Sequence, residues 1–258
     1  MTTRSQDRFS MTMSADDIAA AAARDFTRAL STHWQSQLTG EIIGLYLIGS
    51  LAHGGFSRRY SDIDVALVTE RGLDQAAFNG LCTQALALSS ELGPKVSVFW
   101  TDRDFKGGRF PPLDRADYLD YAVPVIERER IAPSRPTLDE IRGYLAGAPL
   151  TNWIHSAEAF AASEALAPQD RKSYLRALLY PARFVASFMT GKMMSNDDAV
   201  ARLQEFCPPD LDASLIQRAL AYRHAAADPD ELFPARTLLP GQVAALERFV
   251  IHTVADWR

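Results

Sequence analysis

One stretch of the sequence constrains the fold more than any other, the segment LIGSLAHGGFSRRYSDIDVALV at residues 47–68. It joins an almost wholly apolar segment, residues 42–48, to a second apolar segment that begins at Asp62. Short apolar runs rich in β-forming residues are typical of buried strands. The sequence therefore predicts two buried strands joined by a glycine-containing loop, with acidic residues at the start of the second strand.

Asp62 and Asp64 are one residue apart in the second predicted strand. Because side chains alternate along a strand, both carboxylates are expected on one face, with Cα atoms about 6 to 7 Å apart. That spacing lets both reach one Mg²⁺, which prefers oxygen ligands and is often shared between carboxylates and substrate phosphates. An Asp-x-Asp pair alone is weak support, since strand ends and turns often carry such pairs. The ordered combination with the preceding loop is more specific.

The loop itself suits a polyphosphate. Gly49 allows the backbone to approach a phosphate closely, and Ser50 offers a hydroxyl and a main-chain donor. Arg58 and Ser61 are further candidates for nucleotide binding, although Arg58 could equally be an ordinary surface charge. His53 lies in the same loop, and for this residue a phosphate contact and a structural role remain open.

The Gly-Ser pair, the spacer of about ten residues and the Asp-x-Asp pair resemble the signature of the nucleotidyltransferase superfamily. The resemblance implies that Gly49 and Ser50 contact a nucleoside triphosphate and that Asp62 and Asp64 bind magnesium. A second segment, residues 176–203, resembles the helical C-terminal domain of streptomycin and spectinomycin adenylyltransferases. The residues that carry this looser match are Arg183, Thr190, Gly191 and Lys192, although the same residues are common in ordinary helices and C-caps.

Hydrophobic periodicity divides the chain into two parts. The first half alternates predicted helices and strands, with strands at residues 42–48, 62–68 and 95–100. The second half shows only helical spacing, in six segments at residues 138–145, 152–166, 173–190, 197–206, 213–227 and 240–257. We therefore expect an α+β fold: a small mixed-sheet nucleotidyltransferase domain at residues 1–131, then an all-α helical bundle domain at residues 138–258. The segment APSRPT between them has the composition of a linker.

The sequence departs from the resembled family at one position. Active members carry a third carboxylate on the neighbouring strand, where alternation here places Lys95. A lysine cannot bind the metal and is a poor base unless its pKa is strongly lowered. Three explanations stay open. An acid past the strand, Asp102 or Asp104, reaches the site; an acid of the helical half, Glu158 or Glu164, replaces it; or Lys95 pairs with Asp62 or Asp64 and leaves a protein that only binds nucleotide.

Composition narrows the partners. The net charge of −5 lacks the overall positive charge that is typical of nucleic-acid-binding proteins, so nucleic acid is the weaker partner hypothesis. No apolar run approaches the ~20 residues that cross a bilayer, and the polar first ten residues lack a signal peptide's apolar core. The two cysteines, Cys82 and Cys207, indicate neither a disulfide framework nor a zinc site. A cytoplasmic protein without a membrane partner is expected.

These observations lead to one functional hypothesis and two alternatives. The first is a magnesium-dependent nucleotidyltransferase that moves a nucleoside monophosphate, AMP from ATP, to a hydroxyl of a small molecule. The resemblance suggests an aminoglycoside-like acceptor. The second is a catalytically degenerate nucleotide-binding protein of the same fold, because Lys95 stands where the third carboxylate is expected. A third and weaker alternative is an adenylyltransferase that acts on a protein. The sequence leaves the acceptor, the general base and the oligomeric state open.

Overall fold

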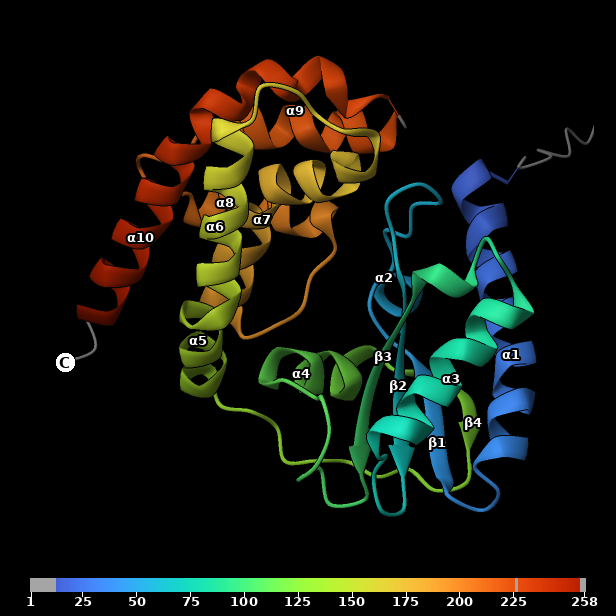
Figure 1. Cartoon of the computed structure of the whole chain (residues 1–258). Helices are drawn as coiled ribbons and strands as arrows, with labels where there is room; N and C mark the ends of the chain where they lie inside the picture. The colour runs from blue at the N-terminus through green and yellow to red at the C-terminus, as the bar shows by residue number, and fades with distance from the viewer. Residues whose placement is uncertain (1–12, 226, 256–258) are drawn as a thin grey trace, which may run out of the picture.

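The computed structural model describes residues 13–225 and 227–255, and it consists of a small sheet with its own helices and a stack of further helices (Figure 1). The first part contains α1 (Ala15–Gln37), β1 (Ile42–Leu47), α2 (Ser50–His53), β2 (Ile63–Thr69), α3 (Gln75–Leu88), η1 (Gly93–Lys95), β3 (Val96–Asp102), α4 (Pro112–Tyr121) and β4 (Val123–Glu127). The second part contains α5 (Leu138–Ala146), α6 (Ala148–Ala162), η2 (Pro168–Asp170), α7 (Arg171–Thr190), α8 (Asn196–Phe206), α9 (Ala213–His224), η3 (Pro229–Leu238) and α10 (Leu239–Ala255).

The four strands form one mixed sheet in the order β3-β2-β1-β4. β1 runs antiparallel to both β2 and β4, whereas β2 and β3 are parallel. The antiparallel pairing of β1 with β2 brings Leu47, the last residue of β1, opposite Val65 near the start of β2. The loop that follows β1 therefore lies at the same edge of the sheet as the acidic start of β2.

Both faces of the sheet are covered. Apolar side chains of α1 and α3, among them Phe26, Trp34 and Leu81, pack on one face against Leu45, Val65 and their neighbours. On the opposite face Tyr118 of α4 packs against Ile43, Tyr46 and Val68. α4 thus lies between the sheet and the helical part, as Figure 1 also shows. This position lets residues of α4 reach the edge where β1 ends.

The second part is organised around α7, whose 20 residues include 12 that are buried. α7 ends at Gly191, which adopts a left-handed φ of 67° and caps the helix with a hydrogen bond to the Ser187 carbonyl. Its neighbours in the core include α8 and α9, and Trp153 of α6 donates its indole N–H to the Ala177 carbonyl at 3.0 Å. The predicted all-α second half is therefore confirmed.

The predicted α+β class is also confirmed, but the three strands predicted for the first half did not include any of residues 118–130. They hold the end of α4 and the whole of β4, and the chain changes from helix to strand within a single residue, Ala122. Such a short helix and strand give a sequence window too little periodicity to separate them. The boundary expected between residues 131 and 138 stays a prediction.

Three further expectations concern the two ends of the chain, membrane-spanning helices and the two cysteines. The last predicted helix reaches Ala255, and residues 256 and 257 lie outside the described residues, as do the first ten residues used in the signal-peptide argument. Within the described ranges, no helix has the length and apolar character needed to traverse a lipid bilayer. Cys82 and Cys207 are free thiols, as expected.

Candidate functional site

The sheet edge brings the predicted glycine bend and the predicted carboxylate together. Gly49 adopts φ 62° and ψ −150°, a conformation essentially confined to glycine. A Cβ added there would lie 2.5 Å from Asp64 Oδ2, so only glycine allows this approach. The Ile48 amide donates to the Asp64 carbonyl at 3.0 Å, which fixes the two segments to one another. The bend after β1 therefore lies directly on the Asp64 carboxylate.

A residue that the sequence analysis did not single out holds this bend in place. Asp117 of α4 is 1% exposed, and its Oδ2 accepts a hydrogen bond from the Gly49 amide at 2.8 Å. Its second oxygen lies 4.0 Å from His53 Nε2. His53 is itself buried and packs edge-on against Tyr121, with ring centroids 5.7 Å apart. His53 thus has a structural contact to α4 in addition to its place in the loop.

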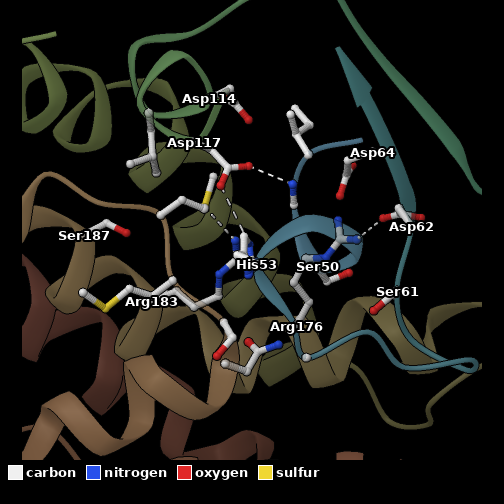
Figure 2. A pocket seen from close by; sticks show the side chains of 18 of the residues that line it. Ser50, His53, Ser61, Asp62, Asp64, Asp114, Asp117, Arg176, Arg183 and Ser187 are labelled. Atoms are coloured by element: carbon white, nitrogen blue, oxygen red, sulfur yellow. Dashed lines mark hydrogen bonds and ion pairs between the residues drawn. The ribbon is translucent and has the colours of Figure 1, made fainter. Parts of the chain in front are cut away.

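The helical part supplies the positive charges of the site. Lys172 Nζ lies 2.5 Å from Asp62 Oδ1. Arg176 donates to Asp62 Oδ2 at 3.0 Å (Figure 2). Both residues belong to α7. Arg223 of α9 donates to Ser61 Oγ at 3.1 Å and to the Gly55 carbonyl at 3.1 Å. The two parts of the chain are therefore joined at the site by ion pairs and hydrogen bonds.

Arg183 of α7 also points toward the carboxylates (Figure 2). It is one of the four residues on which the resemblance to the adenylyltransferases rests. In the described structure its guanidinium contacts Met193 Sδ at 3.2 Å, and burial lowers its pKa while Asp64, Asp114 and Asp117 oppose that shift. A buried cation facing three acids stabilises their ionised forms.

Asp64, Asp114 and Asp117 have raised pKa values. Burial, and then the neighbouring Asp62, raises the pKa of Asp64 to about 6. Burial, and then Asp117 and Asp64, raises the pKa of Asp114 to about 7. Burial likewise raises the pKa of Asp117, although the Gly49 amide opposes the shift. Burial lowers the pKa of His53. Crowded acids with raised pKa values in a cavity are typical of functional sites.

These groups surround one cavity of about 490 Å³ between the sheet edge and the helical part. Five of the predicted site residues line it: Gly49, Ser50, Ser61, Asp62 and Asp64. Three buried polar atoms on its wall have no hydrogen-bond partner in the described structure, namely His53 Nδ1, Asp117 Oδ1 and Tyr180 Oη. Buried polar atoms normally have partners, so these three indicate a polar ligand or water. The size fits a small-molecule site.

Two predicted site residues lie elsewhere. Arg58 is exposed, and its guanidinium faces Glu91 at 3.8 Å rather than the cavity. Lys95 ends η1 just before β3, and its Nζ donates to the Arg58 carbonyl at 2.7 Å. In the described structure Lys95 forms no ion pair with Asp62 or Asp64, and Lys172 and Arg176 contact both oxygens of Asp62.

The other replacements considered for the third carboxylate do not line the cavity either. Asp102 is the last residue of β3, at the far end of the strand, and accepts hydrogen bonds from the amides of Asp104, Lys106 and Gly107. Glu158 and Glu164 are also absent from the cavity wall. At the level of Asp64 the neighbouring strand carries Ser97, which does line the cavity.

Among the described residues, no cluster of three or more His, Cys, Asp or Glu side chains forms a complete metal site. Asp62 and Asp64 nevertheless suit a hard cation that takes its remaining ligands from phosphates and water. In the described structure no group donates a hydrogen bond to the Asp64 carboxylate, which leaves both of its oxygens available. The donor set therefore fits Mg²⁺ together with a phosphate-bearing ligand.

Sequence comparison identifies no relative: no protein-family model matches the chain, and no curated protein does so. Comparison of structures does find similar folds. Spectinomycin adenyltransferase AAD(9) from Enterococcus faecialis, determined with ATP and spectinomycin, superposes with a TM-score of 0.60 at 13% identity. The match covers 85% of this chain and 98% of that one. A chain of the toxin-antitoxin complex MntA-HpeT matches 52% of this chain and 93% of its own length, at 14% identity and a TM-score of 0.29.

The first match spans both the sheet and the helical part, so the likeness includes the way in which the two are combined. At 13% identity it shows the fold and not the activity. The chain shares the fold of spectinomycin adenyltransferase, an α+β sheet region followed by a helical region.

Proposed function

We propose that this protein is a magnesium-dependent nucleotidyltransferase that transfers a nucleoside monophosphate, AMP from ATP, to a hydroxyl of a small molecule. The observation that carries the proposal is the contact between the glycine bend and the acid, where Gly49 lies so close to Asp64 that no Cβ fits between them. The bend carries the chain into Ser50, whose amide has no hydrogen-bond partner among the described residues, beside the carboxylates that a magnesium ion would need. The nucleotidyltransferase fold supports the same conclusion.

The nucleotide is proposed to bind with its phosphates at the bend. Ser50 begins the short helix α2, so its amide and hydroxyl are free to face a phosphate. Arg223 and Ser61 already form a hydrogen-bonded pair on this wall. Lys172 and Arg176, which neutralise Asp62 in the described structure, are positioned to contact phosphate oxygens when a metal ion occupies that carboxylate.

Asp62 and Asp64 would hold the Mg²⁺. The ion would neutralise charge on the triphosphate and polarise the phosphorus that is attacked. Asp64 has to be ionised for this role, and Arg183 favours its ionised form against burial and the charge of Asp62. The acceptor is proposed to be a small hydroxylated molecule that resembles an aminoglycoside, because the structurally similar adenyltransferase was determined with spectinomycin.

The first experiment is calorimetric titration of the folded protein with ATP and Mg²⁺. We expect binding in the parent and at least ~10-fold weaker binding in Asp64→Asn, since the variant loses a charged metal ligand. Asp104→Asn is the matched control, because Asp104 is exposed and pairs only with Lys106. Absence of ATP binding in the folded parent would contradict the proposal.

A second candidate function is nucleotide binding without turnover. The observation in its favour is that β3 offers Ser97, and no acid, next to Asp64. Pyrophosphate release with a panel of hydroxylated acceptors distinguishes the two functions when Lys95→Glu is measured beside the parent. Turnover in the parent that Asp64→Asn abolishes supports the enzyme. Turnover gained only in Lys95→Glu supports the degenerate protein.

A further inference from the structure

The proposed transfer requires a group that accepts the proton of the attacking hydroxyl, and β3 does not supply one. Ser97 pairs in register with Asp64 but is not a base at neutral pH. Lys95, the residue before the strand, is held by the Arg58 carbonyl. The base therefore has to come from another element that reaches the cavity.

Four carboxylates among the described residues line the cavity: Asp62, Asp64, Asp114 and Asp117. Three of them already have a contact or a proposed role in the site. Asp62 pairs with two cations of α7, Asp64 lies against the glycine bend, and Asp117 accepts from the Gly49 amide. Asp114 accepts no hydrogen bond and forms no ion pair in the described part of the chain, yet its side chain lies mostly out of solvent. It is the carboxylate without a structural task.

Asp114 lies in the first turn of α4, one turn before Asp117 on the same face of the helix. Figure 2 shows both on the same side of the cavity, with Asp64 across from them. Since Asp117 is fixed to the bend by a hydrogen bond of 2.8 Å, α4 holds Asp114 at a set distance from the proposed phosphate site. Helix α4 therefore presents Asp117 to the bend and Asp114 to the cavity beside it.

We propose that Asp114 is the general base of the transfer, an inference that rests on the proposed function. The acceptor oxygen forms a bond to the α-phosphorus while the bond from that phosphorus to the pyrophosphate oxygen breaks. The bonding pair leaves with pyrophosphate, and the hydroxyl proton passes to the Asp114 carboxylate. No oxidant, reductant or further reactant is required.

The surroundings of Asp114 suit a base that works near neutral pH. Burial and two neighbouring acids raise its pKa to about 7, and a base is most effective when its pKa lies near the working pH. The charged and titratable groups that face it come from four other places in the fold and from its own helix: Asp64 of β2, Arg109 of the loop before α4, Tyr144 of α5, Arg183 of α7 and Asp117 of α4.

The wall next to Asp114 also has the character of an acceptor site. Phe99 and Tyr180 line this cavity, and the guanidinium of Arg109 lies 5.2 Å from the Phe99 ring centroid. The Tyr180 hydroxyl is buried without a partner. Aromatic faces with a free hydroxyl suit a ring that carries hydroxyl groups. The inference thus places the acceptor in the part of the cavity that Asp114, Phe99 and Tyr180 line.

The test compares the parent with Asp114→Asn, Asp114→Ala and the exposed control Asp139→Asn. Nucleotide binding is followed with ATP and Mg²⁺ by calorimetry, and turnover by pyrophosphate release with spectinomycin, the remaining acceptor panel, or water. We expect both Asp114 variants to bind ATP within about threefold of the parent and to lose about 10² to 10⁴-fold in rate. Added formate should restore part of the rate to Asp114→Ala, and a change in fold would not respond to formate. The control should behave as the parent does.

The pH profile provides a second readout. The rate of the parent should rise with pH through about 7, and that of Asp114→Asn should lack this rise. Three results overturn the inference while ATP binding stands: an Asp114→Asn rate within threefold of the parent, no response of Asp114→Ala to formate, or no pyrophosphate release by the parent. Failure of the parent to bind ATP would instead refute the proposed function itself.

Discussion

Replacing Gly49 with alanine tests the contact on which the proposed site depends. The substitution has two separable effects. The residue has φ 62° and ψ −150°, where a side chain costs on the order of 1 to 3 kcal/mol. In addition, the new methyl group would lie 2.5 Å from Asp64 Oδ2. To restore an ordinary separation of about 3.5 Å, the carboxylate has to move by roughly 1 Å.

Gly54 offers a matched control in the same loop. It also has a conformation that favours glycine, φ 97° and ψ 174°, but nothing lies within 4 Å of a Cβ added there. Gly54→Ala therefore introduces the backbone strain without displacing a carboxylate. Both residues line the cavity, so the two variants differ mainly in what the methyl group meets.

Urea unfolding and calorimetric titration with ATP and Mg²⁺ measure the two effects. We expect both variants to lose about 1 to 3 kcal/mol of unfolding free energy. Only Gly49→Ala should also lose nucleotide binding, by 10-fold or more, since a misplacement of 1 Å in a site can cost about 10²-fold. Equal loss of binding in the two variants, or unchanged binding in Gly49→Ala, would refute the argument that the close approach of Gly49 positions Asp64.

Two further predictions concern the charges of the site. Lys172→Met removes the ion pair to Asp62 Oδ1, so Mn²⁺ alone should bind severalfold more tightly, whereas ATP with Mg²⁺ should bind more weakly. Paramagnetic resonance measures the Mn²⁺ affinity, and calorimetry measures the ATP affinity. An unchanged Mn²⁺ affinity would contradict the argument that a metal ion replaces Lys172 at Asp62. Because burial raises the pKa of Asp64 from its ordinary value of 3.8 to about 6, its contribution to stability is fully present below pH 4 and is lost as pH rises through 6. Metal-free urea unfolding between pH 4 and 8 should therefore show a fall in the free energy of unfolding of the parent that is smaller in Asp64→Asn by on the order of 1 to 3 kcal/mol. Part of the fall should remain in the variant, because the pKa values of Asp114 and Asp117 are also raised by burial.

The sheet edge could be predicted from the sequence because its determinants are local. Alternation within residues 62–68 fixes which side chains share a face, and a glycine at the end of a buried strand indicates a close approach. Strand β1, strand β2 and the proximity of Gly49 to Asp64 follow from one short segment. The cavity between the two parts has no such local signal.

The residues that sequence reasoning missed act over long separations. Asp117 bonds to Gly49, 68 residues earlier, and Lys172 reaches Asp62 across 110 residues. Periodicity predicts that residues 173–190 are helical, but it does not show which side chains of that helix face another part of the chain. One local signal was present, since Asp114 and Asp117 are spaced by one helical turn after a proline pair that begins α4.

Lys95 and Asp114 can be understood together through the charge of the site. Four carboxylates and five cationic side chains of the described residues line the cavity, so its formal charge is close to neutral. An acid at position 95 would lie beside Asp62 and act on it directly, because the charges at these two positions already interact. With Asp114 present on α4, such an acid would add a fifth carboxylate near Asp64 and Asp114, whose pKa values are already raised by burial and then by neighbouring acids. Lysine at position 95 avoids that repulsion. If Asp114 is the base, Lys95→Glu adds repulsion without adding a missing group, so we expect no gain in turnover.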